Sequence, residues 1–77
     1  MADLDRIRWR CRRGLLELDL ILKRFLEVHF DQLDARQREL FDQLLDQPDN
    51  DLLDWALGLG EPDDPRYLPV VQLLRAG

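Results

Sequence analysis

The amino-acid sequence predicts an all-α protein, a compact single-domain bundle of about five short helices. Leucine is abundant, whereas valine and isoleucine are scarce and threonine is absent, so the residues that favour strands are few. No stretch alternates apolar and polar residues with a period of two, and leucines recur instead every three or four positions. At 77 residues the chain is long enough for one domain, so we expect residues 1–77 to form a single unit.

A first helix is predicted from about residue 3 to about residue 13. At 100° per residue, one narrow arc of this helix collects three apolar side chains that we expect to be buried: Leu4, Ile7 and Cys11. Roughly opposite this arc lie Arg6, Arg10 and Arg13. Trp9 lies away from the apolar arc, and the sequence leaves two interpretations open. It either covers a neighbouring helix or stays exposed as a contact residue, because tryptophan is common at interface hot spots.

Gly14 breaks the pattern and predicts a turn into a second helix over about residues 15–30. This helix should supply most of the core through Leu15, Leu18, Ile21, Leu22, Phe25 and Leu26. His29 ends that face, and we expect it to be a structural histidine rather than a metal ligand. Leu16 and Leu20 lie on the far side, where they contact another helix or form an adhesive surface.

Asp34 and Gln37 have the spacing of a capping box that opens a third helix. Apolar residues then recur at helical spacing until Pro48 stops the helix: Leu40, Phe41, Leu44 and Leu45. The cluster 49–51 begins a fourth helix, which Gly58 and Gly60 end. A loop over 61–65 leads to a last short helix over about 66–75. Because the chain lacks serine and threonine, we expect Asp, Asn or Gly to cap each helix.

The missing residue types also exclude several functions. Without serine or threonine there is no hydroxyl nucleophile of that kind, and no phosphate loop with a magnesium-binding hydroxyl. Cys11 and His29 are each the only residue of their type, too few for a zinc site and unable to form a disulfide. We therefore expect no enzyme activity, no metal and no tightly bound cofactor. The start of the chain does not resemble a secretory signal, and no apolar run could span a membrane, so we expect a cytoplasmic protein.

Charge is distributed unevenly along the chain. The net charge is -5, yet five arginines crowd the first segment: Arg6, Arg8, Arg10, Arg12 and Arg13. From Glu27 onward, twelve acidic residues face four arginines. A basic end on an acidic body favours one oriented protein-binding face. The acidic remainder disfavours nucleic acid, because phosphates would be repelled.

One constellation surrounds the predicted turn: Arg12, Arg13, Gly14, Leu15, Leu16, Glu17, Leu18 and Asp19. A structural interpretation is available, since glycine suits a turn and Glu17 would stabilise the first turn of a helix. A functional interpretation is equally available. Gly14 would let another protein approach closely, while Arg13 and Glu17 offer it a fork of donors and an acceptor.

Two stretches resemble the succinate dehydrogenase flavinylation assembly factors, small proteins of bacteria and mitochondria that in some bacteria were called antitoxins. The first contains the family's Arg-Gly-x-x-Glu motif and consists of Ile7, Trp9, Cys11, Arg12, Arg13, Gly14, Glu17, Leu18 and Asp19. The second consists of Phe41, Leu44, Leu45, Pro48, Asp49, Asp51, Leu52, Leu53 and Trp55. With both stretches matched in order, the resemblance extends over almost the whole chain.

The resemblance implies a five-helix domain that acts as a chaperone. It would bind the flavoprotein subunit of succinate dehydrogenase, and in some bacteria that of fumarate reductase, and promote covalent attachment of FAD. The cofactor would belong to the client, and the partner-binding residues would be Arg13, Gly14 and Glu17 with Arg8, Trp9 and Asp19. We expect a monomer, although Leu16 and Leu20 could serve a dimer. The alternative is an antitoxin-like or regulatory module that binds a different protein.

Overall fold

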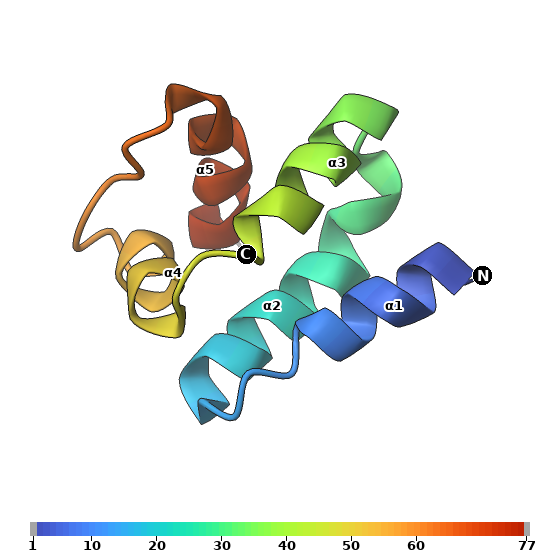
Figure 1. Ribbon diagram of the computed structural model, residues 1–77, viewed down its shortest axis with the longest axis horizontal. Coiled ribbons are helices and arrows are strands. Elements are labelled where there is room, and N and C mark those ends of the chain that lie inside the picture. Colours follow the sequence, from blue (N-terminus) through green and yellow to red (C-terminus); the bar gives the residue numbers. More distant parts are fainter. Residues whose placement is uncertain (1, 77) are drawn as a thin grey trace.

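The computed structural model describes residues 2–76, which form five α-helices and two short 3-10 helices (Figure 1). The α-helices are α1 (Ala2–Arg10), α2 (Leu16–Val28), α3 (Ala35–Leu44), α4 (Asp49–Ala56) and α5 (Leu68–Ala76). The 3-10 helices are η1 (Phe30–Gln32) and η2 (Pro65–Tyr67). No strand occurs in this described part, which measures 33 × 26 × 21 Å, so the prediction of a compact all-α bundle is confirmed.

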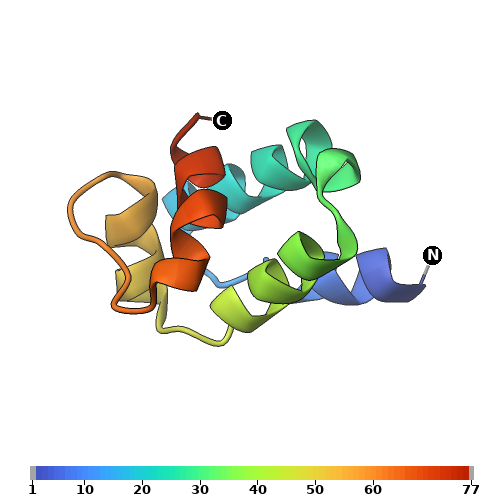
Figure 2. The same cartoon turned by 90° about the horizontal axis from the view of Figure 1, so that it is seen from above.

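The helices pack around α2. Helices α4 and α5 lie side by side, and both contact α2 (Figure 1). Helix α1 lies against α3, to which it is joined by hydrogen bonds from Arg6 and Arg10 to Asp42 (Figure 2). The turn between α1 and α2 lies at the lower edge of the molecule in Figure 1, and hydrogen bonds from Arg13 join it to the chain between α3 and α4.

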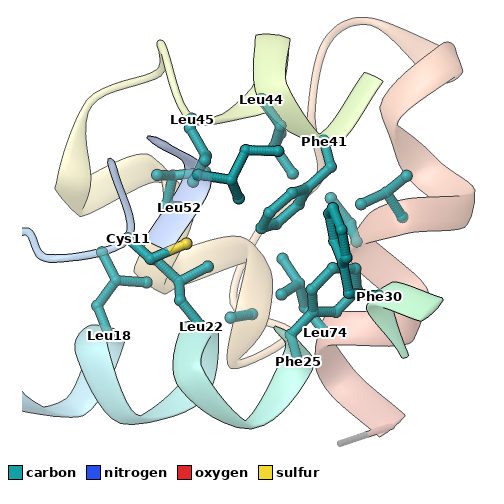
Figure 3. Close-up of a cluster of buried hydrophobic side chains, with 14 of the residues drawn as sticks. Cys11, Leu18, Leu22, Phe25, Phe30, Phe41, Leu44, Leu45, Leu52 and Leu74 are labelled. Atoms are coloured by element: carbon teal, nitrogen blue, oxygen red, sulfur yellow. The ribbon is translucent and has the colours of Figure 1, made fainter. Parts of the chain in front are cut away.

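The core is built from apolar side chains of all five helices and η1. Those with almost no exposure are Leu18, Leu22, Phe25, Phe41, Leu44, Leu45, Leu52, Val70 and Val71. At the centre the rings of Phe25 and Phe41 stack with centroids 4.5 Å apart (Figure 3). Of the predicted apolar arc, Ile7 in α1 and Cys11 just after it are buried, whereas Leu4 is only partly buried against the core. Each fully buried side chain of this size stabilises the fold by roughly 1.5–3 kcal/mol relative to exposure.

Three predicted helix boundaries are wrong by a few residues. Helix α1 ends at Arg10, because the chain turns through residues 11–15 with Gly14 at φ 85°. Helix α2 ends at Val28, and Phe30 is buried in η1. Leu15 precedes α2 in an extended conformation and is 37% exposed, so its assignment to the core was also wrong. An extended residue leaves the 100° periodicity on which that assignment depended.

The predicted caps are correct at α3 and wrong at two other helices. At α3 the amide of Gln37 donates to Asp34 Oδ1 at 2.8 Å, and the amide of Asp34 donates to Gln37 Oε1 at 3.1 Å, which completes the capping box. The N-cap positions of α2 and α4 hold Leu15 and Pro48, with no side-chain hydrogen bond. Both helices carry acidic residues in the first turn instead, which stabilise the positive end of the helix dipole.

We expect Asp34→Ala to lower the free energy of unfolding by about 1 kcal/mol, since the capping carboxylate satisfies an otherwise unpaired amide. In a domain of this size that corresponds to a melting temperature lower by about 4–8 °C. Thermal unfolding followed by circular dichroism would measure it. Asp63→Ala, an equal change in the exposed loop before η2, should shift the melting temperature little. Equal shifts in the two variants would contradict the role of the cap.

Candidate functional site

The predicted site residues gather at the corner where α1 turns into α2. Arg8 and Trp9 end α1, Arg13 and Gly14 occupy the turn, and Glu17 and Asp19 lie in the first turn of α2. The structure nevertheless divides them into two groups. Arg8, Trp9, Gly14 and Glu17 are exposed, whereas Arg13 and Asp19 are partly buried and bonded within the chain.

Arg13 uses its guanidinium inside the protein. Its Nε donates to Asp49 Oδ1 at 2.6 Å, and Nη1 donates to the carbonyl oxygens of Leu45 at 2.7 Å and Arg10 at 3.2 Å. Its Nη2 donates to the carbonyl oxygen of Gln47 at 3.0 Å. The side chain is only 17% exposed. Arg13 therefore fastens the α1–α2 turn to the segment between α3 and α4, and its fork of donors faces this chain instead of solvent.

Asp19 closes the same turn from the side of α2. Its Oδ1 accepts from the amide of Arg13 at 2.8 Å, and its Oδ2 accepts from the amide of Gly14 at 3.3 Å. Gly14 has a φ of 85°, which disfavours any residue with a Cβ, although a Cβ there would meet no atom within 4 Å. The glycine is thus required by the backbone angle, and open space surrounds it.

An apolar patch extends on either side of this turn. Trp9, Leu16 and Leu20 are 71%, 75% and 57% exposed. Trp9 is exposed and covers no neighbouring helix, and the guanidinium of Arg12 lies 5.2 Å from the centroid of its ring. We call the exposed surface around this turn the α1–α2 face. It consists of Arg8, Trp9, Gly14, Leu16, Glu17 and Leu20. Large exposed apolar side chains grouped around polar ones are typical of protein-binding surfaces.

A groove of about 670 Å³ runs between α1 and α2 beside this face. It is lined by Arg8, Cys11, Arg12, Gly14, Asp19, Leu20, Lys23, Leu26 and Glu27. Arg12 and Lys23 were not among the predicted site residues. The position of Lys23 three residues after the exposed Leu20 could have suggested it, since residues i and i+3 share a helix face.

Cys11 lines the groove, yet its side chain is buried in the core (Figure 3). Burial raises the pKa of its thiol from 9.0 to about 12, although the positive charges of Arg13 and Arg10 act in the opposite direction. The thiol is consequently protonated at neutral pH and is a poor nucleophile.

We expect alkylation of Cys11 to be slow in the folded protein and fast in the unfolded one. The rise in pKa lowers the thiolate fraction about a thousandfold near pH 8, and burial blocks access as well. Labelling with iodoacetamide in buffer and in concentrated urea, followed by mass spectrometry, would measure both rates. Similar rates under the two conditions would mean that Cys11 is accessible in the folded state.

Among residues 2–76, no three histidine, cysteine or acidic side chains are grouped so that they could hold a metal ion. Within the same residues no helix is both long and apolar enough to cross a membrane. The candidate site is the turn held by Arg13 and Asp19, together with the α1–α2 face and the groove beside it.

Comparison with known proteins finds a family whose members have the same organisation of sequence. The family described as "Flavinator of succinate dehydrogenase" matches residues 5–77. The "FAD assembly factor SdhE" of Coxiella burnetii is 46% identical over 70 residues, covering 91% of this chain and 85% of the relative. The proteins of the same name from Legionella pneumophila (strain Lens) and Yersinia pseudotuberculosis are 41% and 38% identical, covering 95% and 92% of this chain and 91% and 81% of the relatives. The chain belongs to the family of flavinators of succinate dehydrogenase.

Proposed function

We propose that this protein binds the flavoprotein subunit of succinate dehydrogenase through the α1–α2 face and promotes covalent attachment of FAD to that subunit. The observation that carries the proposal is the exposure of Trp9, Leu16 and Leu20 around a rigid turn, in a chain whose relatives are named FAD assembly factors. The flavoprotein of fumarate reductase is a second client of the same chemistry. A reducing cytoplasmic compartment suits the free thiol of Cys11.

The mechanism we propose is positioning without catalysis by this chain. Covalent flavinylation requires a histidine nitrogen of the client to lie against a methyl carbon of the flavin, and mobile domains of the client must be fixed for that. Holding reacting groups in such a geometry can contribute about 7–11 kcal/mol in the best cases. A compact helical module bound as a monomer would stabilise the reactive arrangement, with the α1–α2 face as its contact surface.

FAD itself belongs to the client in this proposal. The amides that precede α2 are where a pyrophosphate could bind, because amides near the start of a helix attract anions. Here the amides of Arg13 and Gly14 already donate to the carboxylate of Asp19, and Glu17 adds a second negative charge to the same turn. These residues do not fit a dinucleotide phosphate, so this chain would act on the flavoprotein and not on free FAD.

The test is covalent flavin on the succinate dehydrogenase flavoprotein, measured by in-gel fluorescence in cells with and without this protein. We expect the fluorescent band to be lost on deletion and restored by the wild-type chain. An unchanged band would contradict the proposal. A pull-down from the same cells distinguishes this function from the alternative, because an antitoxin-like module would capture a small toxin in place of a large flavoprotein.

A further inference from the structure

We propose that the groove between α1 and α2 receives an acidic segment of the client flavoprotein, whose carboxylates pair with Arg8, Arg12 and Lys23. The inference rests on the proposed function and specifies which chemistry of the client the site recognises.

The groove is basic on a protein that is otherwise acidic. The whole chain carries a net charge of -5, yet three of the side chains that line the groove are cations. Among the side chains of residues 4–76, which the structure describes, the ion pairs involve other arginines, namely Arg6, Arg10, Arg13, Arg66 and Arg75. Arg8, Arg12 and Lys23 are exposed and take part in none of these pairs. Arg12 lies over the ring of Trp9, but none of the three cations has an ion-pair partner among these residues, so a partner's carboxylates can reach them.

The two acidic residues of the groove do not cancel this charge. Asp19 is committed to the amides of Arg13 and Gly14, which reduces its capacity to accept further donors. Glu27 lies four residues, about one helical turn, after Lys23 on the same face of α2 and lines the end of the groove away from the α1–α2 turn. The three cations of the groove therefore exceed its two carboxylates. The acidic remainder of the molecule would repel a negative segment, which favours binding of such a segment at this location.

The groove also contains apolar surface, which defines the ligand further. Leu20 is largely exposed, Leu26 is half-buried, and both lie beside the basic side chains. The client segment would carry an apolar residue between two acidic ones. Its apolar side chain would pack against Leu20 while its carboxylates pair with the basic side chains. Charge complementarity of this kind raises the rate of association and selects the orientation of the partner.

Lys23 permits a direct test because it is the only lysine in the chain. A carbodiimide couples an amine to a carboxylate only when the two are in contact, without adding a spacer. We expect treatment of the complex with the apo-flavoprotein to join Lys23 Nζ to an aspartate or glutamate of the client, mapped by mass spectrometry. Lys23→Arg keeps the charge but offers no amine, so the coupled peptide should vanish even from the fraction that elutes as the complex.

The possible outcomes distinguish a failure of the groove assignment from a failure of the proposed function. Size-exclusion chromatography first establishes whether the complex forms at all, and its absence would overturn both proposals. A complex in which Lys23 couples to no client carboxylate would overturn the groove assignment alone and leave the proposed function standing.

A pair of charge-reversed variants provides a second measurement. Arg8→Glu with Arg12→Glu should weaken binding to the apo-flavoprotein by at least about tenfold at low salt, and the remaining affinity should depend less on salt. Arg24→Glu with Arg36→Glu changes the net charge equally at exposed positions outside the groove. Equal losses in the two double variants would show that only the overall charge matters, which would overturn the assignment.

Discussion

Replacing Gly14 with arginine should abolish binding to the flavoprotein while the helical fold is kept. A Cβ at this position meets no atom of the chain within 4 Å, so the added side chain would project into the space that the α1–α2 face offers to a partner. We expect a loss of affinity of at least about a hundredfold, which corresponds to roughly 2.7 kcal/mol. Covalent flavin on the client, measured by in-gel fluorescence, should fall accordingly.

The variant will also be strained, because Gly14 has a φ of 85°. Placing an L-residue in the left-handed region costs roughly 1–2 kcal/mol. Loss of stability alone could therefore imitate a loss of binding. Gly58 supplies a matched control, since its φ is 77° and a Cβ there likewise meets no atom within 4 Å. It follows α4 and does not line the groove.

Gly58→Arg should lower the melting temperature about as much as Gly14→Arg and leave binding nearly unchanged. Calorimetric titration of both variants with the apo-flavoprotein, at a temperature where circular dichroism shows both folded, would make the comparison. If folded Gly14→Arg binds as tightly as Gly58→Arg, the α1–α2 face is not the contact surface. If both variants lose binding equally, backbone strain and not steric exclusion is the cause.

Local patterns in the sequence predicted the elements of the fold well. The capping box of Asp34 and Gln37 and the periodic burial of Leu18, Leu22 and Phe25 depend on residues three or four positions apart, which a sequence displays directly. Leu15 was misassigned because its burial depends on the backbone angle of the turn before the helix. That angle is set by tertiary hydrogen bonds and not by the periodicity of α2.

The sequence predicted that the candidate residues lie around the α1–α2 turn, but it did not predict which of them are bonded within the chain. Arg13 bonds to Leu45, Gln47 and Asp49, which lie 32, 34 and 36 positions away in the sequence. Asp49 looked like an acidic residue at the start of a helix, and that is also its position in the structure. Nothing local indicates that it faces Arg13. The groove depends in the same way on how two helices are set side by side.

Arg13→Ala should destabilise the isolated chain by about 2–3 kcal/mol, before any client is present. The substitution removes a charged donor group that is mostly buried, and leaves the carbonyl oxygens of Leu45 and Gln47 and the carboxylate of Asp49 without it. Hydrogen bonds to charged groups contribute about 1.5–3 kcal/mol each, and partial exposure to water at Asp49 reduces the sum. The melting temperature should fall by roughly 10–20 °C.

Two substitutions make this expectation specific. Arg12→Ala removes the neighbouring exposed arginine, which faces Trp9, and should change stability by no more than about 0.5 kcal/mol. Arg13→Lys retains the charge but should recover only part of the loss, because one ammonium group cannot reach the acceptors on four residues that the planar guanidinium group reaches. Urea unfolding of the three variants would measure these differences.

A double-mutant cycle then decides whether Arg13 positions the turn or contacts the client. If Arg13 acts through Asp49, Asp49→Asn should cost much less in the Arg13→Ala background than in the wild type. Arg13→Ala should also weaken binding to the client, because it loosens the turn. Asp49→Asn loosens the same turn from a position far away in the sequence, so it should weaken binding as well. Should Arg13→Ala prove as stable as Arg12→Ala and yet fail to bind, the internal bonds contribute little. Arg13 would then belong with Gly14 and Glu17 on the surface that meets the flavoprotein.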